Sequence, residues 1–171
     1  MEKVLVVYAS RMGSTAEIAR EIADQLIRRG HVVDVCSSAK APDAPSYDAV
    51  IVGSAVHLNH WDKGALHYLQ DQAPDLAERP TWLFQSGPCG QESGSQHAQA
   101  PHRISQLCSE IGAHESKVFG GNLDPAHAVT WLDRRLTAGA NAGDYRNWDD
   151  IRAWADSIAD ELAAARVPVA L

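Results

Sequence analysis

The chain alternates short apolar runs with longer segments of helical periodicity, and this alternation limits its possible folds more than any other feature. Residues 4–8 form a continuous run of β-branched and aromatic type, which is typical of a strand covered by helices on both faces. After a polar loop, Ile18, Ile22 and Leu26 recur on one stripe of a helix. A strand, a loop and a helix in this order indicate the first unit of a parallel α/β fold.

The same alternation continues to the end of the chain. Further strands are predicted at residues 31–36, 49–53, 81–84 and 117–121. Helical patterns lie between them and after them: Ala65, Leu66 and Leu69 after Asp62; Ile104, Leu107, Cys108 and Ile111 before Gly112; and Ile151, Trp154, Ala155, Ile158 and Leu162 after Asn147. Because parallel neighbours need crossover connections, we expect a doubly wound, five-stranded parallel sheet with helices on both faces and ligands at its carboxyl edge.

Residue types at the predicted helix ends also favour this reading. Ser14 and Glu17 have the spacing of a capping box, and Gly30 stops the first helix after two arginines. Asp62 and Asn147 are expected N-caps, and Gly112 an expected stop. The 171 residues suit one domain, residues 1–171, with residues 124–143 as an irregular excursion before the last helix.

Composition and charge exclude several classes of protein. The content of 45% hydrophobic and 22% charged residues is that of an ordinary globular protein, and a net charge of −7 argues against a nucleic-acid partner. The three cysteines, Cys36, Cys89 and Cys108, lack the close pairs of zinc sites and fit a reducing cytosol. With no secretion signal and no apolar run of about 18 residues, we expect a cytoplasmic protein with at most peripheral membrane contact.

Residues 10–15 follow the first strand and open the first helix, where free backbone N–H groups and the positive end of the helix dipole converge. Ser10, Ser14 and Thr15 add hydroxyl donors, Gly13 permits close approach of the backbone, and Arg11 adds charge. The pattern predicts a phosphate-binding loop. Simple capping by Ser14, worth about 1 kcal/mol without any ligand, explains the same residues equally well.

The loop also excludes some phosphate chemistry. It has neither the Walker pattern nor G-x-G-x-x-G, which argues against resident ATP or NAD. It has no nucleophilic cysteine, and Tyr8, Ala9 and Ser10 stand where a phosphoacceptor domain would carry an aspartate. We therefore expect the loop to hold phosphate without cleaving it.

Two further loops, residues 54–61 and 86–94, follow strands at the same predicted edge of the sheet. His57, His60 and Trp61 in the first loop, with the glycines of the second, suit a flat heterocycle attached to the phosphate. The candidate cofactor-binding residues are Ser10, Arg11, Met12, Gly13, Ser14, Thr15, Ala55, Val56, His57, Leu58, Asn59, Trp61, Ser86, Gly87, Pro88, Cys89 and Gly90.

Residues 10–15 resemble the phosphate loop of flavodoxins, and the five-strand layout is similar along the whole chain. The branch with menaquinone-dependent protoporphyrinogen oxidases is more similar still, in Arg11, Gly13 and Thr15, in His60 and Trp61, in Gly120 and Gly121, and in residues 144–148. The chain departs from that branch at His57, where an arginine is common, and in residues 124–143, where Arg134 and Arg135 are the only arginines or lysines.

The resemblance implies a flavodoxin-like fold with strand order 2-1-3-4-5, FMN as cofactor and an FMN-dependent oxidoreductase. The implied partners are a redox partner or a small-molecule substrate, with protoporphyrinogen as substrate and a quinone as acceptor. Two alternatives stay open: an electron carrier without small-molecule turnover, and a regulatory or scaffold domain that has lost the flavin.

His57 and His60 are the candidate catalytic residues. As a hypothesis, a protonated imidazole beside the ring favours two-electron chemistry, because it stabilises the negative charge gained on reduction. The same pair, with His67 or Asp62, could ligate a metal, but the loop shows no convincing third and fourth ligand, so no metal is expected. Packing is expected for Trp82, Trp148 and Trp154, whereas Trp61 is expected to face the ligand, and Cys89 receives no redox role.

Overall fold

The computed structural model describes residues 1–57, 60–87, 101–114, 116–123 and 143–165. The elements, in chain order, are β1 (Lys3–Ala9), α1 (Ser14–Arg28), β2 (Val32–Ser37), the 3-10 helices η1 (Ser38–Lys40) and η2 (Ala44–Ser46), β3 (Ala49–His57), β4 (His60–Trp61), α2 (Lys63–Asp71), α3 (Ala73–Leu76), β5 (Thr81–Gly87), α4 (His102–Ile111), β6 (Lys117–Gly120), β7 (Asn122–Leu123), β8 (Gly143–Asp144) and α6 (Trp148–Ala164).

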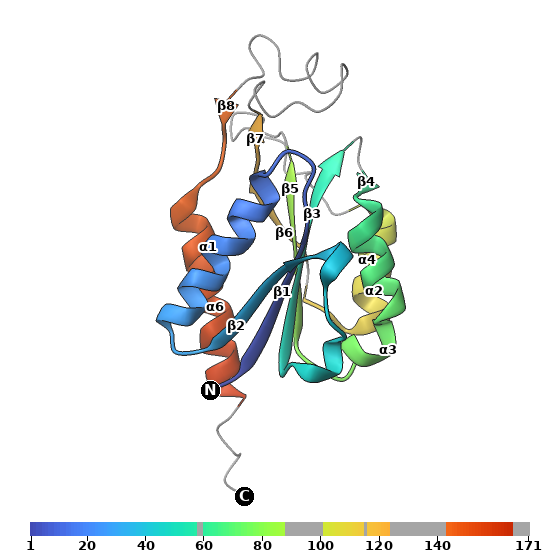
Figure 1. The fold of residues 1–171 in the computed structure, drawn as a ribbon, viewed down its shortest axis with the longest axis vertical. Helices are drawn as coiled ribbons and strands as arrows, with labels where there is room; N and C mark the ends of the chain where they lie inside the picture. The colour runs from blue at the N-terminus through green and yellow to red at the C-terminus, as the bar shows by residue number, and fades with distance from the viewer. Residues whose placement is uncertain (58–59, 88–100, 115, 124–142, 166–171) are drawn as a thin grey trace, which may run out of the picture.

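A parallel sheet in the order β2-β1-β3-β5-β6 forms the centre of the molecule. These strands are the five that the sequence predicts, so the expected order is confirmed. Two features are additional: the short β4 pairs antiparallel with the end of β3, and β7 pairs antiparallel with β8. The parallel strands run upward in Figure 1, away from the N-terminus at the bottom, and β7 and β8 lie at the top.

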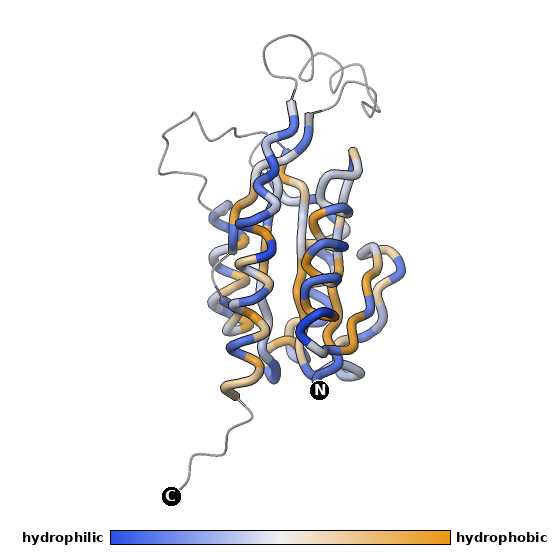
Figure 2. The backbone as a smooth tube through the Cα atoms, turned by 90° about the vertical axis from the view of Figure 1, so that its left-hand side faces the viewer, coloured by the Kyte–Doolittle hydropathy of each residue, from blue (hydrophilic) through white to orange (hydrophobic). Residues whose placement is uncertain are grey.

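Helices cover both faces of the sheet, so each face has its own apolar core (Figure 1). On one face, alternate residues of β1 such as Val4 and Val6 pack against α1 and α6. On the other, Leu5 and Val7 pack against α2, α3 and α4. Figure 2 views the first face and shows α1 and α6 side by side, each with hydrophilic and hydrophobic residues alternating along it. This alternation is what a one-sided apolar stripe predicts.

The predicted helix ends are confirmed at four positions. Gly30 and Gly112 take positive φ angles of 90° and 63° just beyond α1 and α4. Asp62 accepts a hydrogen bond from the Gly64 amide, and Asn147 accepts from two amides in the first turn of α6. The predicted capping box is wrong, because α1 begins at Ser14 itself, one residue earlier than an N-cap at Ser14 requires. Gly13 is the N-cap residue and no side chain caps it.

Several strands extend further than predicted, and this changes the nature of one loop. β3 continues to His57 and β5 to Gly87, so residues 54–57 are strand and not loop. The apolar run ends at Gly53, but the backbone pairing of β3 with β5 continues through Ala55 and Ser86. Of the 124–143 excursion, residues 124–142 lie outside the described residues. The segment begins beyond β7 and returns at β8, which are paired with each other.

Candidate functional site

A pocket of about 480 Å³, the solvent at its mouth included, opens at the carboxyl edge of the sheet. The ends of β1, β3, β5 and β6 and the first turn of α1 meet there. Its described lining residues are Ser10, Arg11, Met12, Ser14, Thr15, Ala55, Val56, His57, Ser86, Gly87, Gly121 and Asn122. The pocket thus brings the candidates of residues 10–15 together with the described candidates at the ends of β3 and β5. Two described candidates do not line it: Gly13, which lies within the loop, and Trp61.

The phosphate loop turns through a left-handed residue into α1. Gly13 has φ 91° and donates its amide hydrogen to Ser10 Oγ at 3.0 Å. The amide of Glu17 donates to the Gly13 carbonyl, which is the first bond of the helix. Amides of the intervening first turn have no partner inside the helix. Those amides and the positive end of the helix dipole are groups that attract an anion.

Three hydroxyls of the loop are bonded within the protein and still retain hydrogens for a ligand. Ser10 Oγ accepts from Gly13, and Ser14 Oγ accepts from the Asn122 amide at 3.0 Å. The hydroxyls of Thr15 and Ser86 are 2.7 Å apart and both are buried. An accepting hydroxyl keeps its own hydrogen, and the Thr15–Ser86 pair uses one hydrogen of two. The loop is therefore held in shape without losing its donors.

The described side chains at the pocket that can carry charge are basic. Arg11 is exposed, half-buried His57 lies at the end of β3, and no described lining residue carries a carboxylate. His60 is the register partner of His57 but does not line the pocket. In a chain with net charge −7, this local excess of basic groups favours an anionic ligand. Among the described residues no group of three potential metal ligands occurs.

Trp61 does not face the pocket as expected. Trp61 is only 3% exposed and packs in the core beneath α2. Its indole N–H donates to Gln85 Oε1 at 2.9 Å. The β3–β4 pairing turns this residue inward, a consequence of a strand that sequence patterns did not reveal. Burying both the indole and its hydrogen-bond partner is a stable alternative to ligand stacking.

The structure adds two lining residues, Gly121 and Asn122, that were not among the cofactor candidates. The available signal was their place at the end of the fifth predicted strand, at the carboxyl edge. Among the candidates, Leu58, Asn59, Pro88, Cys89 and Gly90 lie outside the described residues.

Three backbone segments approach closely beside the pocket. The Gly121 amide donates to the Gly87 carbonyl at 2.7 Å, and the Tyr145 amide donates to the Gly121 carbonyl at 3.0 Å. A Cβ atom on Gly120 would stand 2.0 Å from the Tyr145 carbonyl oxygen. Glycine is therefore required at position 120 for the chain entering α6 to pass this edge of the sheet.

Arg146 lies in that same passing segment and is almost fully buried among acidic partners. Its guanidinium donates to both Asp144 carboxylate oxygens, at 2.7 and 2.6 Å, and also contacts Glu17 in the first turn of α1. It lies 4.6 Å from the ring centroid of Trp148. Its hydrogen bonds lower the pKa of the Asp144 carboxyl below the ordinary value. Arg146 thus joins β8 to the helix that opens at the phosphate loop.

The chain belongs to the flavodoxin domain family, whose sequence model matches residues 5–139. Proteins of this family bind FMN and act as electron carriers or oxidoreductases, so FMN is the cofactor that family membership supports.

Known relatives agree with this assignment. A segment of 84 residues is 27% identical to protoporphyrinogen IX dehydrogenase [quinone] of Escherichia coli K12, covering 48% of this chain and 46% of that protein. The match thus spans about half the length of the curated relative. An archaeal flavodoxin superposes with a TM-score of 0.64 at 16% identity, covering 94% of this chain and 99% of its own. Flavodoxin 1 of Bacillus cereus gives 0.63 at 16% identity, with coverage of 92% and 97%. The flavodoxin-like fold is confirmed.

The residues present fit the phosphate end of FMN. Free first-turn amides, hydroxyls with unused hydrogens and the guanidinium of Arg11 are donors suited to an anion, with no carboxylate among the described lining residues. Next to these donors, Ala55, Val56 and Met12 supply apolar surface.

In the part of the chain that the structure describes, no helix has the length and apolar character to span a bilayer.

Proposed function

We propose that the chain is an FMN-dependent oxidoreductase whose phosphate loop, residues 10–15, anchors the cofactor. The observation that carries this proposal is the donor-lined start of α1 at the mouth of the pocket. FMN supplies the hydride or electron transfer when bound. The protein's part is to bind the phosphate through first-turn amides, hydroxyls and Arg11, and to place Ala55 and Val56 beside the rest of the ligand.

The charge of the pocket favours an oxidoreductase over a pure electron carrier. Arg11 and His57 lie at the pocket, and no described lining residue opposes them with negative charge. A basic surrounding stabilises the negative charge of a reduced ligand and therefore favours transfer of two electrons. We propose protoporphyrinogen as the substrate and a quinone as the acceptor, because these are the substrates in the name of the E. coli relative.

A pair of glycine variants tests FMN binding with a matched control. Gly13 and Gly30 flank the same helix, have φ angles of 91° and 90°, and each has nothing within 4 Å of an added Cβ. Replacement by alanine should therefore lower the free energy of unfolding by the same amount at both positions, about 1 kcal/mol of backbone strain. We expect Gly13→Ala to weaken FMN binding, measured by quenching of FMN fluorescence, about tenfold more than Gly30→Ala, because only Gly13 shapes the phosphate loop.

Turnover then separates the candidate functions. The FMN-loaded protein should oxidise protoporphyrinogen IX with a menaquinone analogue as acceptor, followed by porphyrin fluorescence. FMN binding without turnover would instead support the electron-carrier alternative. Absence of FMN quenching by the wild-type chain would overturn the FMN proposal and favour the flavin-free alternative.

A further inference from the structure

We infer that Arg146 is a positioning residue for the phosphate loop, acting from outside the pocket by neutralising Glu17 and by fixing β8 against the first turn of α1. The inference rests on the proposed FMN site. Arg146 is not among the pocket's lining residues, and its side chain is 7% exposed.

The contacts around Arg146 form a closed ring. Ser14 and Glu17 lie three residues apart in the first turn of α1. Ser14 Oγ accepts from the Asn122 amide in β7, and Asn122 is the register partner of Asp144 in β8. Asp144 accepts from Arg146, which also contacts Glu17 and so returns to α1. The start of the helix is thus held from both strands of the β7–β8 ladder.

Electrostatics gives this ring a consequence for phosphate binding. The Glu17 side chain is 50% exposed and lies one helical turn beyond Gly13, near the end of the helix that would receive a doubly charged phosphate. A carboxylate there suits the helix dipole but repels the phosphate. The positive charge of Arg146 offsets that repulsion, because its guanidinium pairs with the Glu17 carboxylate. Without Arg146, both Glu17 and Asp144 would lose their shared cation.

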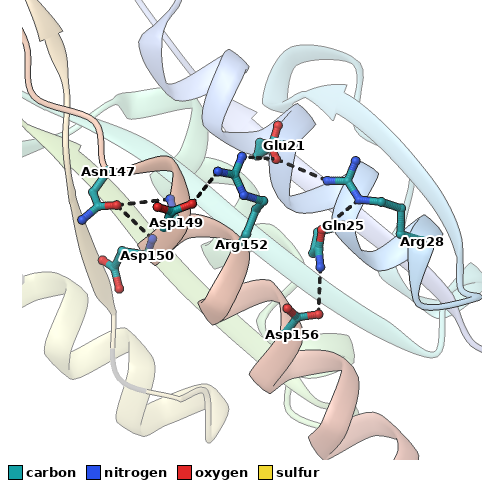
Figure 3. Close-up of polar contacts among 8 residues, drawn as sticks. All are labelled: Glu21, Gln25, Arg28, Asn147, Asp149, Asp150, Arg152 and Asp156. Carbon is teal, nitrogen blue, oxygen red and sulfur yellow. Dashed lines mark hydrogen bonds and ion pairs between the residues drawn. The ribbon is translucent and has the colours of Figure 1, made fainter.

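Arg152 provides a matched control on the same seam between α1 and α6. It contacts Glu21 at 3.1 Å and Asp149 at 2.7 Å, so it too joins a carboxylate of α1 to a second acidic residue, here in the first turn of α6 (Figure 3). Glu21 lies a further turn along α1 from the phosphate loop than Glu17 does. Gln25 and Asp156 continue the seam still further from the loop (Figure 3).

The experiment compares the dissociation constants of FMN and riboflavin by fluorescence quenching at low ionic strength. We expect Arg146→Met to weaken FMN binding about tenfold and to leave riboflavin, which lacks the phosphate, within about twofold of wild type. Arg152→Met should change neither ligand more than about twofold. Adding Glu17→Gln to Arg146→Met should recover most of the lost FMN affinity, and added salt should reduce the difference.

Each outcome bears on one of the two proposals. Equal losses for FMN and riboflavin, or equal effects of Arg146→Met and Arg152→Met, would overturn the role of Arg146 while leaving the FMN site intact. A wild-type protein that binds neither ligand would overturn the FMN site and, with it, this inference. If Arg146→Met does not fold, Glu17→Gln alone decides: it should tighten FMN binding about threefold without affecting riboflavin, and no change would overturn the inference.

Discussion

At the residue scale, the phosphate loop depends on partners that lie far along the chain. Thr15 pairs with Ser86, 71 positions away, and the Ser14 hydroxyl accepts a bond from Asn122, 108 positions away. Both hydroxyls of the Thr15–Ser86 pair are buried, with 1% and 4% exposure. A buried hydroxyl deprived of its partner bears the full cost of desolvation, whereas removing both partners together costs less.

The Thr15–Ser86 pair therefore predicts strong coupling between two substitutions. Thr15→Val and Ser86→Ala should each lower the free energy of unfolding by about 1 to 3 kcal/mol, and the double variant by less than their sum. Urea denaturation without added FMN measures all three. Ser109→Ala is the control, because that exposed hydroxyl donates to a carbonyl in its own helix. Additive losses would show that the two hydroxyls do not stabilise each other.

At the scale of elements, the packing of β3 against β5 places the two strand ends that line the pocket. Gly53 and Phe84 are register partners in these strands. Phe84 is fully buried and contacts both Phe119 and Trp154 edge-on or tilted, so its ring cannot move aside easily. The absence of a side chain at position 53 makes room for that ring.

A Cβ at position 53 would stand 2.0 to 2.5 Å from three atoms of the Phe84 ring. We expect Gly53→Ala to lower the free energy of unfolding by about 3 kcal/mol, because overpacking of a rigid core is not relieved by small shifts. Thermal unfolding monitored by circular dichroism measures the loss. Gly87→Ala is the control, since its Cβ would meet Val56 at an ordinary 3.9 Å. Combining Gly53→Ala with Phe84→Leu should cost less than the sum of the two, and a full sum would refute the steric explanation.

At the scale of the whole molecule, the sheet gathers basic groups at one end of an acidic protein. The net charge is −7, yet Arg11 and His57 are the charged or titratable side chains among the described lining residues of the pocket. They come from the loop after β1 and from the end of β3, which adjacent parallel strands bring to the same edge. The fold, and not the overall composition, therefore sets the potential that a bound cofactor experiences.

This arrangement predicts that His57 raises the reduction potential of the FMN-loaded protein. A basic side chain beside the cofactor stabilises the negative charge gained on reduction, so His57→Ala should lower the midpoint potential measured by potentiometry. His60→Ala should have less effect, because His60 does not line the pocket, and exposed His67 in α2 serves as the distant control. Equal potentials in wild type and His57→Ala would remove His57 from the redox role.

Local sequence was sufficient for the fold class, the five parallel strands, the position of the loop between β1 and α1, and four of the helix ends. Periodicity and end residues such as Asn147 and Gly112 act over a few neighbouring positions, and the carboxyl ends of parallel strands must share one edge. Tertiary structure alone decided that Trp61 turns inward to Gln85, that Asn122 bonds to Ser14, and that Arg146 reaches Glu17 across 129 positions. Those contacts depend on strand register and on the path of the chain past Gly120, which sequence patterns do not specify.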